Sequence, residues 1–226
     1  MKLSPKNENY YGMKPDVINN TQMAVNGRAI SADVSGYLSN KLESMYEGAT
    51  ALYLMGDAAD QIPQKTADYW RAGADGKAER VQLSVQEGLA FVKDLGDKMT
   101  TSALGIINKI DCRDSSPNIS LTPTSFSWPL KNGTMGNVDV EIMRIGADLT
   151  LVGLKPEINA LTGLALRNGS PFKNTVAVSF LNGDQKYLPD AQAYLDNTRE
   201  ISRTDFSAGA AEKFLETVFD ILNDMK

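Results

Sequence analysis

One stretch decides the fold class: Val138-Asp-Val-Glu-Ile-Met-Arg-Ile145, followed by Gly146-Ala-Asp148 and Leu149-Thr-Leu-Val-Gly-Leu154. Apolar residues recur at every second position from Val138, which is the period of a half-buried strand. Gly146–Asp148 favours a turn, so the stretch predicts a β-hairpin. The short apolar run Thr175–Leu181 predicts a further buried strand.

Helical patterns surround these strands. We expect helices over residues 35–46 (with Asp33 as N-cap), 76–95, from Pro156 to about 168, and 208–225. Ala49–Met55 is predicted to be a buried strand between Gly48 and Gly56. Ile119–Leu130, which contains two prolines, is predicted to be an edge strand or an extended segment. The pattern indicates a single α/β domain, with a mixed β-sheet and flanking helices, preceded by an irregular segment over residues 1–29.

Composition excludes several classes of function. The chain has 226 residues, and 23 Lys and Arg against 28 Asp and Glu give a net charge of −5, which disfavours nucleic acid as a partner. There is no histidine and one cysteine, Cys112. Ser-His-Asp and Cys-His catalysis, histidine metal cages and cysteine zinc sites are therefore excluded for this chain alone.

No targeting or membrane segment is predicted. The longest apolar runs have strand length, far below the roughly 20 residues of a transmembrane helix. The first residues, Met1–Asn9, lack an apolar core, so no signal peptide is predicted.

Three polar loops follow predicted buried strands, at 56–64, 155–157 and 182–188. Loops at the carboxyl ends of neighbouring strands meet at one edge of a sheet, where α/β proteins bind ligands. This would bring together Asp57, Asp60, Glu157, Asp184 and Tyr187, a set of oxygen donors suited to a hard or borderline cation. Each residue also has a structural interpretation. Glu157 suits a first helical turn, Asp57 and Asp60 suit a turn, and Tyr187 suits packing beside Leu188.

Five stretches in order resemble the catalytic domain of the neutral/alkaline non-lysosomal ceramidases. They are Ile30-Ser-Ala-Asp-Val-Ser-Gly36, Leu54-Met-Gly-Asp-Ala-Ala-Asp-Gln-Ile-Pro63, Arg144-Ile-Gly-Ala-Asp-Leu-Thr-Leu-Val-Gly-Leu-Lys-Pro-Glu157, Asn182-Gly-Asp-Gln-Lys-Tyr-Leu-Pro189 and Ala208-Gly-Ala-Ala-Glu-Lys-Phe214. The resemblance covers about residue 19 to the C-terminus. It indicates the C-terminal half of such a domain, over residues 30–226.

The resemblance implies a zinc amidohydrolase that cleaves the N-acyl bond of ceramide. Glu157 matches the family's glutamate zinc ligand and Tyr187 its tyrosine ligand, while Asp57, Asp60, Asn182 and Asp184 would lie on the rim of the site. The implied partners are a ceramide-like lipid or another amide substrate, and the missing N-terminal half of the domain. Family members are often secreted or membrane-associated.

The sequence departs from the family at its metal site. The histidine-bearing first half is absent, Asn19 stands where a further histidine is expected, and Pro156 replaces the glycine of Pro-Gly-Glu. Ile62 replaces a serine that some members carry. We therefore expect the chain alone to hold no zinc and to be inactive. A degenerate, non-catalytic homologue with a lipid-binding or structural role, and a hydrolase of another amide, are the alternatives.

Overall fold

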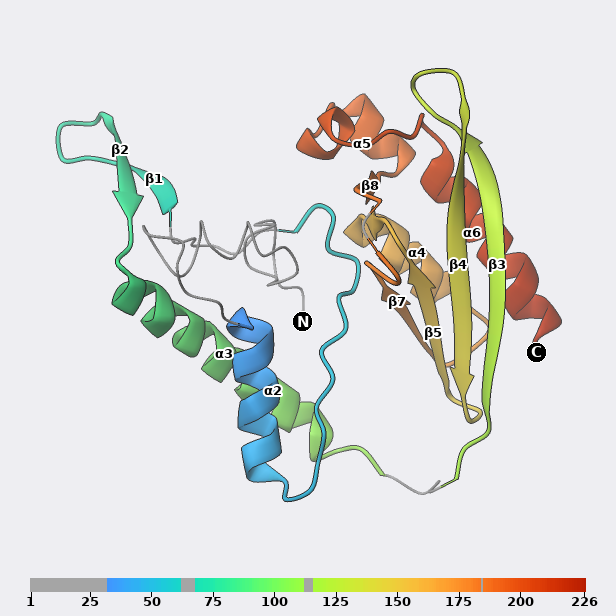
Figure 1. Ribbon diagram of the computed structural model, residues 1–226, viewed down its shortest axis with the longest axis horizontal. Coiled ribbons are helices and arrows are strands. Elements are labelled where there is room, and N and C mark those ends of the chain that lie inside the picture. Colours follow the sequence, from blue (N-terminus) through green and yellow to red (C-terminus); the bar gives the residue numbers. More distant parts are fainter. Residues whose placement is uncertain (1–31, 62–67, 112–115, 184) are drawn as a thin grey trace. The chain divides into compact units, whose positions relative to one another are not determined.

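The predicted hairpin strands form the centre of a mixed sheet in the computed structural model, which describes residues 32–61, 68–111, 116–183 and 185–226 (Figure 1). The strand order is β3 (Ile119–Pro129), β4 (Met135–Ile145), β5 (Leu149–Leu154) and β7 (Asn174–Val178). β3, β4 and β5 pair antiparallel, whereas β5 and β7 pair parallel. The predicted mixed sheet with flanking helices, and β3 as an edge strand, are confirmed.

Two helices pack on the same face of this sheet, α4 (Ala160–Gly169) and α6 (Ala210–Asp224) (Figure 1). The alternating apolar residues of β4 point toward them and are fully buried. Helix α6 presents Phe214, Val218 and Leu222 at a spacing of four residues, which places them on one helical face in the same cluster. Burial of this cluster supplies the main stabilisation of the sheet and its helices.

The crossover from β5 to β7 carries a short strand of its own. Strand β6 (Glu157–Ile158) follows β5 directly and pairs parallel with β8 (Tyr187–Leu188), which follows β7. After β8 the chain forms α5 (Ala191–Leu195) and the 3-10 turn η1 (Arg199–Ser202) before α6.

The contacts of the described residues divide the chain into two compact units. The elements above belong to unit 2, which comprises Leu54–Gln61 and Cys112–Lys226. Unit 1 takes its described residues from Met1–Tyr53 and Ile62–Asp111. The single-domain interpretation predicts that both units unfold in one transition, which stays a prediction.

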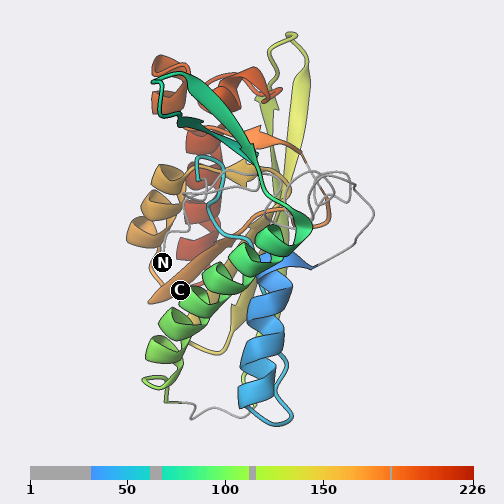
Figure 2. The same cartoon turned by 90° about the vertical axis from the view of Figure 1, so that its left-hand side faces the viewer.

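Unit 1 is built on two helices, α2 (Asp33–Met45) and α3 (Val85–Ile107), which lie side by side (Figure 2). Val34, Val92 and Met99 form its buried apolar cluster. Gly96 permits the close approach of the helices, because a Cβ atom there would lie 2.3 Å from Cδ1 of Tyr37. A hairpin of β1 (Asp68–Ala72) and β2 (Ala78–Gln82) precedes α3.

Two sequence predictions about unit 1 and the following segment are wrong. The helix predicted over 76–95 begins only at Val85, because Ser84 and Glu87 form a reciprocal capping box and Gly76 lies in the hairpin turn with φ of 75°. Ala49–Met55 is not a strand. Leu52 and Leu54 are exposed. Among the described residues, one backbone hydrogen bond joins this segment to the residue after β7: the Ser179 N–H donates to the Met55 carbonyl.

Two predicted helix starts also require correction. Pro156 does not begin a helix. Glu157 and Ile158 are extended, and α4 begins at Ala160 with Asn159 as N-cap. Asp33 is the first residue of α2 rather than its cap, which is Ala32. No helix in the part of the chain that the structure describes is long and apolar enough to span a membrane.

Replacing Phe214 with alanine is expected to destabilise unit 2 by about 3–5 kcal/mol, because truncating a fully buried phenylalanine loses its burial and leaves a cavity. Phe214 is 0% exposed in the main cluster. Leu195→Ala is the matched control, since Leu195 is 80% exposed and should change stability little. Urea unfolding of both variants measures the effect, and equal stabilities would contradict the assignment of the core.

Asp33 should make unit 1 less stable as the pH rises. Burial raises the pKa of this carboxyl group from 3.8 to about 8. Between these values the folded state keeps a proton that the unfolded state has lost, so the contribution of Asp33 to stability is greatest below pH 4 and falls as the pH rises toward 8. Asp33→Asn should remove this part of the pH dependence. The free energy of unfolding is measured against pH for the wild type and for Asp33→Asn. If the two curves run parallel, Asp33 does not contribute to the pH dependence.

Candidate functional site

Glu157 and Tyr187 lie side by side on the β6–β8 ribbon of unit 2. They are direct partners in the parallel pairing, as are Ile158 and Leu188. Ile158 and Leu188 point into the apolar core, so Glu157 and Tyr187 both point to the opposite face of the ribbon. They are nevertheless buried, at 5% and 3% exposure. The structure therefore brings together the carboxylate and the phenol that the sequence singles out.

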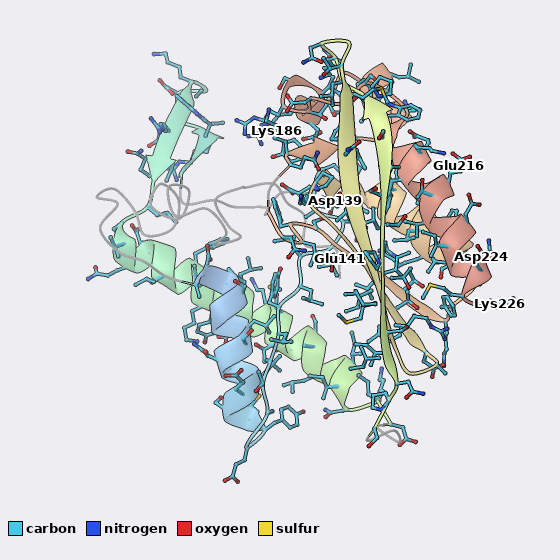
Figure 3. All side chains as sticks on the ribbon, turned by 45° about the vertical axis from the view of Figure 1, so that its right-hand side comes forward. Asp139, Glu141, Lys186, Glu216, Asp224 and Lys226 are labelled. Carbon is cyan, nitrogen blue, oxygen red and sulfur yellow. The ribbon has the colours of Figure 1, made fainter. Side chains whose placement is uncertain are left out.

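Hydrogen bonds hold both residues by their backbones. The Glu157 N–H donates to the Lys186 carbonyl at 2.8 Å, and the Thr204 hydroxyl donates to the Tyr187 carbonyl at 2.7 Å. The exposed side chain of Lys186, labelled in Figure 3, forms an ion pair with Asp205 at 2.7 Å. The relative position of Glu157 and Tyr187 is thus set by main-chain contacts that do not use their side chains.

The loop that leads to Tyr187 has a strained backbone. Phe180, Asn182 and Lys186 adopt positive φ values of 63°, 56° and 60°. For side chains other than glycine this conformation costs roughly 1–3 kcal/mol each in unfavourable cases, and such strain concentrates at functional sites. The described residues on either side of position 184 thus include three in a conformation that most side chains disfavour, and one of them, Lys186, directly precedes Tyr187.

Asp57 and Asp60 lie on the segment 54–61 and both bind α4. The carboxylate of Asp57 accepts two hydrogen bonds from the Arg167 guanidinium, each 3.1 Å long. Asp60 Oδ1 accepts the Ala160 N–H at 2.9 Å, at the first turn of the helix. These contacts support a structural role for Asp57 and Asp60, rather than a role as ligands of a cation.

Asn182 lines a groove on the outer face of the sheet, formed by β3, β4 and the ends of β5 and β7. Its side-chain amide donates to Glu141 Oε1 at 2.8 Å, and Lys155 pairs with Asp139 in the same groove. Figure 3 labels Asp139 and Glu141, which both lie on β4. The Asn182 side chain thus contacts β4. Asp184, Asn19, Ile62 and Cys112 lie outside the described residues.

Sequence reasoning missed two buried polar residues next to Glu157. Asn159 and Thr162 are 3% and 2% exposed, and neither Asn159 Oδ1 nor Thr162 Oγ1 has a hydrogen-bond partner among the described residues. The sequence offered one signal for Asn159, its position as a possible N-cap two residues after Glu157. That position identifies Asn159 as unusual only when its burial is known.

The described donor set does not fit the zinc that the resemblance implies. Zinc sites in proteins use histidine or cysteine, and an all-oxygen set favours other cations. The chain has no histidine, and the described residues contain no group of three or more Cys, Asp or Glu side chains able to hold a metal. The residues that the structure places together are oxygen donors only.

Comparisons with solved structures identify the fold. The chain is similar to the neutral ceramidase from Pseudomonas aeruginosa, with a TM-score of 0.61 and 12% sequence identity over 93% of this chain. It is also similar to a ceramidase complexed with C2, with a TM-score of 0.60 and 12% identity over 86% of this chain. The chain spans 42% of the length of each of these proteins. No protein-family model and no curated protein matches the sequence. The chain therefore has a ceramidase-like fold.

Replacing Gly163 with alanine is expected to destabilise the protein by about 1–3 kcal/mol through overpacking. A Cβ atom at Gly163 would lie 2.4 Å from the carboxylate of Asp57, which Arg167 holds in place. Gly105→Ala is the matched control, because nothing lies within 4 Å of a Cβ atom there. It should stabilise α3 by about 0.5–1 kcal/mol. Thermal unfolding measures both, and stabilisation by Gly163→Ala would show that the segment 54–61 does not pack on α4 as described.

Proposed function

We propose that this chain carries the Glu157–Tyr187 part of a ceramidase-like amide hydrolase site, and that alone it binds an N-acyl amide without hydrolysing it. The observation that carries the proposal is the parallel pairing of Glu157 with Tyr187, both buried on one face of the β6–β8 ribbon. These are the two residues that the resemblance to ceramidases assigns to the metal site.

A carboxylate beside a phenol complements an amide group. An ionised carboxylate only accepts hydrogen bonds, so Glu157 would accept from the amide N–H. The Tyr187 O–H can donate to the amide carbonyl oxygen and polarise it. Both side chains are buried, at 5% and 3% exposure, so they would lose little rotamer freedom on orienting the amide.

Hydrolysis needs a further group to activate water. Metal-bound water or a histidine base serves this purpose near neutral pH. The chain has no histidine, and the described residues contain no metal-holding cluster. A complete site would therefore draw its remaining groups from outside the residues described, and the chain alone should bind its substrate unchanged.

The substrate class follows from the structural neighbours, which are named as ceramidases. We therefore take a ceramide-like lipid amide as the ligand to test first. A degenerate homologue with a lipid-binding or structural role is the second candidate. The absence of histidine and the binding of Asp57 and Asp60 to α4 favour it over a complete enzyme.

The test is the binding of a fluorescent short-chain ceramide to the purified chain, followed by fluorescence anisotropy. Glu157→Gln and Tyr187→Phe should each weaken binding about tenfold, which corresponds to about 1.4 kcal/mol. Glu216→Gln and Tyr46→Phe are matched controls, because both side chains are exposed and should leave affinity unchanged. Equal affinities for all five proteins would contradict the proposed site.

Release of fatty acid from the same lipid tests the inactivity of the chain. We expect no turnover, with or without one equivalent of added zinc, and less than stoichiometric zinc by elemental analysis. One equivalent of bound zinc, together with turnover that Glu157→Ala abolishes, would show that the chain is a complete enzyme.

A further inference from the structure

We draw no further inference here: the strongest candidate, the face of the β3–β4–β5–β7 sheet opposite α4 and α6, where Ile119, Leu121 and Val176 are exposed, carries nothing because nothing in the part of the chain that the structure describes shows what covers it.

Discussion

The parallel pairing of β5 with β7 is the interaction on which the rest of unit 2 depends. Parallel neighbours cannot be joined by a tight turn and need a crossover connection, which here contains β6 and α4. Because both strands run in the same direction, the chain leaves them at the same edge of the sheet. The segments that follow, β6 and β8, are therefore brought together as a second parallel pair. The meeting of Glu157 and Tyr187 is a consequence of strand direction.

Close packing at this edge makes the second pairing possible. The Leu181 N–H donates to the Leu154 carbonyl at 3.0 Å, so the chain after β7 follows the end of β5 before it reaches β8. Gly153 permits this approach, because a Cβ atom there would lie 2.4 Å from Cδ2 of Leu181. Two contacts accompany the positive φ values at Phe180 and Lys186: the hydrogen bond from Leu181 to the end of β5, and the surface ion pair of Lys186 with Asp205.

The sequence reveals the elements whose pattern reflects burial on one face. The alternation from Val138 and the spacing of Phe214, Val218 and Leu222 each predict an element that the structure contains. Prediction fails where a local signal is stronger than periodicity. The Ser84–Glu87 capping box starts α3 later than its apolar spacing suggests. Ala49–Met55 is apolar enough for a strand, but strand formation requires a partner that composition does not specify.

At the candidate site, too, the sequence predicts some residues and not others. Glu157 and Tyr187 could be named in advance, because their loops follow predicted strands and their motifs resemble those of ceramidases. The neighbours of Glu157 could not be predicted, because the partners of a polar side chain are set by tertiary contacts. Asp57 and Asp60 are ordinary loop carboxylates in the sequence, and only the folded segment 54–61 shows that they bind α4. Asn159 and Thr162 are ordinary helix-start residues until their burial is known.

A fold shared at 12% identity fixes where side chains meet, but it does not fix which atoms they bring. The backbone of β6 and β8 delivers two side chains to one place whatever their chemistry. In this chain the residues delivered are oxygen donors, while the carboxylates of Asp60 and Asp57 bind the first turn of α4 and Arg167. Asn159 and Thr162, at the start of α4, add a buried carboxamide and a buried hydroxyl. Neither group can replace an imidazole in binding zinc or in accepting a proton near neutral pH.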